Sequence, residues 1–287
     1  MKKYVFFALT GLAALCACSN DQTVEKVVQT KEITFSVDGD FGPSRFRAPA
    51  TRASLSADGS EMTDLWLFDY MDGQLVQQLH QSPTDADWGT PKMTLAYGSH
   101  HVYFVAARGD EPTVDQTSHI IEWSIPRDAF WLDYAVDVTS TSTTSRSVVL
   151  DRVATKLKVT IKDEVPAACT QLSLTPSVWY YGLDYVNGLA VRSDNKERTV
   201  TVPASYAGTS GQLVMSIFGL SDTDEWTSDV VLKSLDDDGT VLGQVTLNGA
   251  PFKRNRATEY SGNLFGSGGG IDVSLNDTWE QSYSAEW

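Results

Sequence analysis

The chain has 287 residues, enough for about two domains, and 41% of them are hydrophobic, so a sizeable core can be buried. The 37 acidic residues outnumber the 22 basic ones, which argues against nucleic acid and anionic lipid head groups as partners. Eight Trp, together with recurring Thr, Ser, Val and Gly, favour strands and turns over helices.

The N-terminus has the organisation of a bacterial export signal. Two lysines precede an apolar run at residues 5–17, which is shorter than the ~20 residues of a membrane-spanning helix. The run ends in Leu-Cys-Ala-Cys at residues 15–18, a pattern similar to the bacterial lipobox. We therefore expect residues 1–17 to be a signal peptide and Cys18 to be the lipidated N-terminus (palmitate) of a lipoprotein. The alternative is an ordinary signal peptide with incidental cysteines.

Cysteine usage leaves the fold without cross-links. If Cys16 is removed with the signal and Cys18 carries the lipid, Cys169 has no partner for an intramolecular disulfide. Removal of the two N-terminal lysines leaves 20 basic residues against 37 acidic ones, a net charge of −17. Such a charge suits an extracellular surface and carries no information about the fold.

The mature chain is expected to begin with a tether and a strand. Residues 18–30 are polar and without periodicity, which is typical of a flexible tether. The domain begins at Lys31, where Ile33, Phe35 and Val37 alternate with polar residues, the pattern of a half-buried strand.

An arginine-containing linker follows that strand. Pro43 and Pro49 disfavour regular pairing, so the segment is expected to be extended and open to a protease. Cleavage is predicted after Arg47 or Arg52, with Arg45 as the less favoured site.

More strands are expected up to residue 107. Residues 65–70 are apolar on both faces, as in a central strand, and a hairpin turn at Asp72-Gly73 leads to a returning strand at residues 75–79. Residues 93–97 and 101–107 predict two further strands, whereas residues 114–126 give no clear pattern. The Ser/Thr-rich segment 139–145 is expected to be a solvated loop between two halves of the protein.

The second half opens with strict alternation at residues 156–162. Leu157, Val159 and Ile161 should face a core, and the intervening residues, Lys156 and Lys158 among them, should face water. Strands recur at intervals of about 8–12 residues with turns between them, which indicates β-sandwiches or barrels. We expect an all-β protein with an N-terminal β-sandwich domain at 31–147 and a C-terminal one at 148–287. The further strands expected lie at residues 171–175, 198–202, 212–220, 230–235, 241–247, 259–264 and 271–275.

Motifs that carry chemistry are scarce, and we expect no enzyme, cofactor or metal site. The four histidines lack zinc-ligand spacing, and His100 and His101 should point to opposite faces of a strand. Asp236–Asp238 could bind Ca²⁺, although three acids before a Gly favour a solvated hairpin tip. The aromatic residues of segment 179–185 could stack on sugars or belong to a core. A hydrolase that uses two carboxylates is a further alternative, but nothing in the sequence selects a pair.

Four local patterns in order make the chain resemble the fimbrillin family, the lipoprotein-derived subunits of type V fimbriae in Gram-negative anaerobes. They are the lipobox at Cys18, the segments 50–53 and 62–73, the segment 150–159, and the segment 252–265 followed by a last strand and Trp279.

The resemblance implies two transthyretin-like β-sandwich domains in tandem, exported as a lipoprotein to the cell outer membrane, with surface exposure in a fimbrium (pilus). It also implies that an Arg-specific protease removes an N-terminal strand, and that a strand of another fimbrial subunit, of the same or a related kind, fills the groove by β-strand complementation. The candidate donor strand in this sequence contains Ile271, Val273 and Leu275, and the tail 279–287 is a second candidate.

The expected function is therefore a structural fimbrial subunit for cell adhesion. The alternatives are a surface glycan-binding lipoprotein and a non-polymerising fimbrial anchor or tip subunit.

Overall fold

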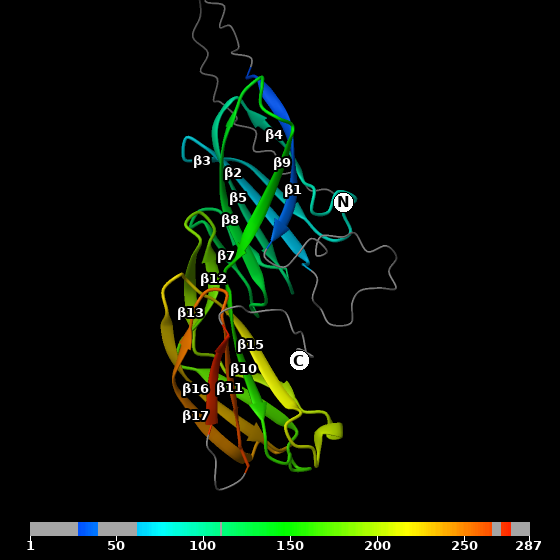
Figure 1. The fold of residues 1–287 in the computed structure, drawn as a ribbon, viewed down its shortest axis with the longest axis vertical. Helices are drawn as coiled ribbons and strands as arrows, with labels where there is room; N and C mark the ends of the chain where they lie inside the picture. The colour runs from blue at the N-terminus through cyan, green and yellow to red at the C-terminus, as the bar shows by residue number, and fades with distance from the viewer. Residues whose placement is uncertain (1–27, 40–61, 110, 266–270, 277–287) are drawn as a thin grey trace, which may run out of the picture.

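The computed structural model describes residues 28–39, 62–109, 111–265 and 271–276, and Figure 1 shows an elongated molecule with two β-rich bodies end to end. Apart from a 3-10 turn at Ala204–Tyr206, the regular elements of these residues are strands. The prediction of an all-β protein is confirmed. No helix of the described residues is long and apolar enough to cross a membrane.

The N-terminal half is built on a seven-stranded sheet in the order β3-β2-β5-β8-β9-β1-β4. The strand β9 connects the two parts of this sheet, because its last residues, Asp151 and Arg152, pair with β8 while residues 145–150 pair with β1. Two layers result, β3-β2-β5-β8 and β9-β1-β4, and they enclose a core. The bounds are β1 (Thr30–Gly39), β2 (Asp64–Met71), β3 (Gln74–Gln81), β4 (Lys92–Ala96), β5 (Gly98–Ala107), β8 (Ala129–Val138) and β9 (Ser145–Arg152).

Alternating apolar residues of both layers fill this core. Leu67 of β2 and Phe104 of β5 face Ile33 and Phe35 of β1, and all four are fully buried. The rings of Phe35 and Phe104 meet edge to face with centroids 5.2 Å apart, which is a favourable aromatic geometry. The predicted strand at residues 33–37 is confirmed, together with the predicted direction of its side chains.

The C-terminal half contains two four-stranded sheets, β15-β10-β18-β19 and β14-β11-β16-β17. Leu157, Val159 and Ile161 of β10 are at most 2% exposed in the core between them, as the alternation predicted. The tight turn predicted at Asp236–Gly239 joins β16 to β17. The bounds are β10 (Ala154–Ile161), β11 (Gln171–Pro176), β14 (Arg198–Thr201), β15 (Leu213–Leu220), β16 (Trp226–Leu235), β17 (Val241–Phe252), β18 (Ala257–Gly262) and β19 (Ile271–Asn276).

A small sheet in the order β13-β12-β7-β6 joins the halves. Its strands β6 (Thr113–Asp115) and β7 (Ile120–Glu122) come from the segment whose sequence pattern was unclear. The strand β6 pairs with β7, and β7 pairs with β12 (Trp179–Asp184), far along the chain, which in turn pairs with β13 (Leu189–Asp194). The predicted division at residue 147/148 falls within β9, which continues unbroken to Arg152, and two separate domains remain a prediction.

Two details of the sequence analysis were wrong. Lys156 does not face water: it is 5% exposed, and its ammonium lies 5.0 Å from the centroid of the Phe218 ring. Arg108 of the N-terminal half lies over the same ring, so the face of β10 and β15 that carries Lys156 and Phe218 is covered there. The Ser/Thr-rich segment 139–145 is mostly exposed, but it connects β8 to β9 inside the N-terminal half and does not link two halves.

Candidate functional site

The strand β1 lies between two neighbours that reach it from later parts of the chain. It pairs antiparallel with β4, with Thr30 opposite Ala96, and parallel with β9, with Val37 opposite Val148. In Figure 1 it runs beside β9, although more than 100 residues separate the paired positions. Parallel neighbours need a long connection, so sequence alternation alone could not have placed β1 between these two strands. We call the space that β1 occupies between β4 and β9 the β1 site.

Backbone hydrogen bonds hold β1 on both sides. The amides of Phe35 and Val37 donate to the carbonyls of Pro91 and Gly89 on the β4 side, at 2.9 and 3.0 Å. On the other side the Thr34 amide donates to the Thr144 carbonyl at 2.8 Å. A strand bonded on both sides leaves two rows of unpaired backbone groups if it departs, and buried groups of this kind are costly.

The inward side chains of β1 occupy apolar pockets. Ile33 and Phe35 are 0% exposed and Val37 is 6% exposed. The ring of Phe35 packs edge to face against Phe104 and also against Tyr134, whose centroid lies 5.9 Å away. Without β1, this core would open to solvent between β4 and β9, which makes the β1 site the strongest candidate for binding another strand.

Most predicted site residues lie outside the described residues. This holds for the lipidation site and the three processing arginines (Cys18, Arg45, Arg47 and Arg52), so these assignments stay predictions. The backbone of the candidate donor segment forms β19, which pairs antiparallel with β18 at an edge of its sheet, with Ile271 opposite Gly262. The structure thus places β19 in the C-terminal half and does not bring it to β1.

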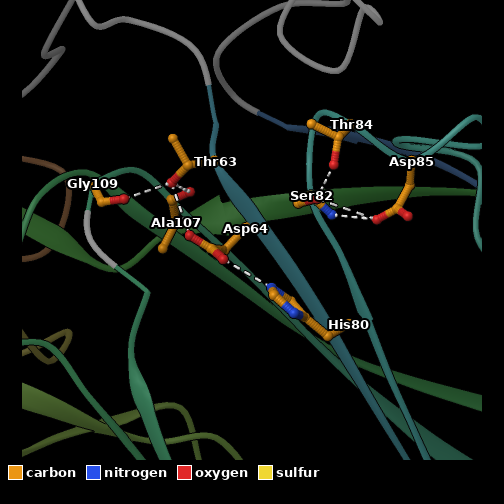
Figure 2. Close-up of polar contacts among 8 residues, drawn as sticks. All are labelled: Thr63, Asp64, His80, Ser82, Thr84, Asp85, Ala107 and Gly109. Carbon is orange, nitrogen blue, oxygen red and sulfur yellow. Dashed lines mark hydrogen bonds and ion pairs between the residues drawn. The ribbon is translucent and has the colours of Figure 1, made fainter. Parts of the chain in front are cut away.

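Sequence reasoning missed a polar cluster at the start of β2, shown in Figure 2. The Thr63 hydroxyl donates to one oxygen of Asp64 at 2.8 Å, and the other oxygen of Asp64 lies 2.8 Å from Nε2 of His80. The His80 ring stacks on Trp66 with centroids 3.9 Å apart. Because the carboxylate, and not the imidazole, contacts the hydroxyl, the order differs from that of a catalytic triad. Through the contact of Asp64 with His80, the cluster holds the beginning of β2 to the end of β3.

A second contact between a histidine and an aspartate, His100 with Asp69, lies at the opposite end of the same layer. His100 and His101 point to opposite faces, as predicted: the side chain of His100 is 1% exposed and that of His101 is 54% exposed. The ring of His100 contacts Asp69 through Nδ1 at 2.8 Å and the carbonyl of Ala96 through Nε2 at 2.9 Å. Nothing in the spacing of these residues along the chain indicated this contact.

The other candidate sites take on structural roles. Asp236 accepts hydrogen bonds from the backbone of Asp238 and Thr240, as a hairpin tip does. Trp179 and Tyr185 of the aromatic segment are 0% exposed and belong to cores, whereas Tyr180 and Tyr181 are partly exposed. Among the described residues, no group of three His, Cys, Asp or Glu side chains lies close enough together to hold a metal ion.

The family of unknown function DUF6562 matches residues 113–287, more than half of the chain. This chain belongs to that family. No curated protein matches the sequence.

Several solved structures share the fold at low sequence identity. A candidate polysaccharide-binding protein (DUF1812) from Bacteroides thetaiotaomicron is 8% identical with a TM-score of 0.55, over 87% of this chain and 96% of that one. A candidate cell adhesion protein from Bacteroides uniformis is 12% identical with a TM-score of 0.51, over 86% and 98% of the two chains. The tip fimbrial protein Mfa3 from Porphyromonas gingivalis is 13% identical with a TM-score of 0.47, over 86% and 99%. The first two likenesses show the fold of this chain.

Proposed function

We propose that this protein is a cell-surface fimbrial subunit for adhesion, assembled when a strand of a neighbouring subunit replaces β1. The observation that carries the proposal is the position of β1 in the middle of the β9-β1-β4 layer, with both backbone edges bonded and its apolar side chains buried. Loss of an edge strand would shorten a sheet, whereas loss of β1 divides a layer in two. Only another strand restores both rows of hydrogen bonds and fills the pockets.

The sequence around β1 supports its release. The strand lies near the N-terminus, and the three arginines at residues 45, 47 and 52 follow it before β2 begins. One cut after any of them would separate β1, with its predicted lipid at Cys18, from the rest of the protein. The lipid would bring the precursor to the outer membrane surface before that cut.

The candidate donor strand matches β1 in pattern. Ile-Thr-Phe-Ser-Val at residues 33–37 and Ile-Asp-Val-Ser-Leu at residues 271–275 share alternation, length, the first Ile and the Ser in fourth place. The proposed alignment places Ile271, Val273 and Leu275 in the pockets of Ile33, Phe35 and Val37. Two neighbours with TM-scores of 0.55 and 0.51 carry names of a polysaccharide-binding and a cell adhesion protein, which agrees with a surface role.

A glycan-binding lipoprotein is the less favoured function. Sugar binding by stacking needs exposed aromatic faces, and within the segment 179–185 the rings of Trp179 and Tyr185 are fully buried while Tyr180 and Tyr181 are only partly exposed. A non-polymerising anchor or tip subunit would share the β1 site but would keep β1 or lack a donor.

Processing and assembly can be separated by two variants expressed in the native cell. With Arg45, Arg47 and Arg52 all changed to Ala, we expect a full-length, lipidated monomer. Deletion of residues 271–287 should leave cleavage intact and block polymerisation. The readout is a blot after partial heating in detergent, where strand-exchanged polymers give a ladder. Normal polymers from the triple variant would contradict the proposal and favour an anchor or a glycan binder.

A further inference from the structure

The strand β4 depends on β1 more than any other strand of its layer. It is the last strand of the sheet, so β1 is its lateral neighbour in the order β9-β1-β4. With β1 in place, Met93 and Leu95 of β4 are 1% and 0% exposed. If β1 leaves as proposed above, only the packing of these side chains and the short connection to β5 still hold β4. A strand of five residues that has lost its only hydrogen-bonded neighbour is prone to local opening. A site that must accept a new strand needs this wall to stay in place.

One buried side chain crosses from the facing layer to the end of β4. His100 of β5 reaches the carbonyl of Ala96, the last residue of β4, at 2.9 Å through Nε2. Its other ring nitrogen lies 2.8 Å from Asp69 of β2. Both side chains are at most 2% exposed. Since Ala96 pairs with Thr30, this contact lies where β1 enters the β1 site.

The partner of Nε2 requires that this nitrogen of His100 carries a proton. A carbonyl oxygen can only accept, so the proton on Nε2 must point at Ala96. Nδ1 then either donates to an ionised Asp69 or accepts from a protonated one, and the pair is neutral overall in both cases. Burial raises the pKa of the Asp69 carboxyl, while the nearby His100 opposes the rise. In either state Asp69 orients the ring, and the ring holds β4.

We propose that Asp69 and His100 are positioning residues that hold β4 as a fixed wall of the β1 site, so that the site stays open to an incoming strand. Asp69 acts through His100, and His100 acts through the Ala96 carbonyl. The inference rests on the proposed function for its purpose, whereas the tie itself can be tested without strand exchange.

The first test is hydrogen-deuterium exchange of the uncut full chain at residues 92–97. The variant His100→Phe removes both hydrogen bonds, and we expect this segment to exchange about tenfold faster. The variant Asp69→Asn keeps them, because its amide donates to Nδ1 and leaves the Nε2 proton on Ala96, so exchange should stay near the wild-type rate. Val102→Ala is the control for general core damage, since Val102 is fully buried on β5 and has no contact of this kind with Ala96.

The second test measures strand recapture. The full chain is cut in the arginine-containing linker, and a labelled synthetic peptide copying residues 29–39 competes with the cut strand. We expect Asp69→Asn to take up the peptide like the wild type and His100→Phe to take it up about tenfold more slowly.

The outcomes separate the two claims. Exchange at residues 92–97 that is no faster in His100→Phe than in Val102→Ala would overturn the positioning role. Equal damage by Asp69→Asn and His100→Phe would also overturn it, because Asp69→Asn preserves the bond to Ala96. If the wild type takes up no peptide, the strand-exchange function fails, and the exchange data still decide whether the pair fixes β4.

Discussion

At the scale of single residues, Phe35 contributes most to the hold of β1 on the core. Its ring is fully buried and meets two other rings edge to face. Changing Phe35 to Ala should lower the free energy of unfolding by about 3–5 kcal/mol, because it leaves a cavity between the layers. The exposed neighbour Ser36 is the matched control, and Ser36→Ala should change stability by less than about 0.5 kcal/mol. Denaturant unfolding of both variants measures the difference.

The two lysines of β10 give a second comparison of burial. Lys156 is buried over the Phe218 ring, whereas the side chain of Lys158 is 24% exposed and lies 3.4 Å from Glu259. Lys158→Ala should cost little, as expected for a partly solvated ion pair at the surface. Lys156→Ala should cost about 2 kcal/mol more, because it removes packing and a desolvated cation-π contact. Equal thermal shifts for the two variants would contradict the placement of Lys156.

These residues also show how far the sequence can predict the fold. Alternation at 33–37 and 157–161 was sufficient to identify both strands and their buried faces, because burial of one face produces a period of two. The burial of Lys156 could not be predicted, since it depends on the Phe218 ring of β15, over which Arg108 from the N-terminal half also lies. The pairing of Asp69 with His100 has the same origin, because the two residues meet only when β2 pairs with β5.

At the scale of elements, the fit of one strand into the place of another can be tuned. In the proposed alignment Val273 enters the pocket that Phe35 fills in this structure, and Val is much smaller than Phe. Val273→Phe should therefore make polymers more resistant to heating in detergent, by filling a void next to Phe104 and Tyr134. The temperature at which the ladder collapses measures the effect, and unfolding of the monomer controls for changes within the C-terminal half. A lower collapse temperature with an unchanged monomer would contradict the alignment.

Short strands mark the limit of prediction at this scale. The strands β6 and β7 have three residues each, too few for a periodic signal. The strand β6 pairs with β7, and β7 pairs with β12, which lies about 60 residues further along the chain. The strand β1 was predicted as an element, but its place between β4 and β9 depends on contacts distant in sequence, and so does the candidate site.

At the scale of the whole molecule, Arg152 links the two halves. It bonds both oxygens of Asp128, at 2.9 and 3.2 Å, and also the side-chain oxygen of Asn255 in the C-terminal half at 2.9 Å. Arg152→Met should cost about 3–5 kcal/mol, because it leaves the fully buried Asp128 without its arginine. The exposed pair Arg192–Glu122 has the same 2.9 Å contact, and Arg192→Met should cost less than about 1 kcal/mol. Denaturant unfolding of the two variants measures the difference in their free energies of unfolding.

The central claim is that a donor strand takes the place of β1, and one cross-link tests it directly. Ser36 of β1 faces Ser147 of β9 in the parallel pair, and the proposed alignment puts Ser274 of the neighbouring subunit where Ser36 lies. Adjacent strands are about 5 Å apart, within reach of a disulfide. In this structure Ser274 instead pairs with Glu259 of β18.

The measurement uses the full chain with Ser147→Cys and Ser274→Cys, processed and assembled in the native cell, and analysed by denaturing electrophoresis with and without reductant. The account predicts a covalent ladder that reductant collapses to the processed monomer, and no ladder when Arg45, Arg47 and Arg52 are changed to Ala in the same background. Polymers that form normally but carry no cross-link between positions 147 and 274 would contradict it.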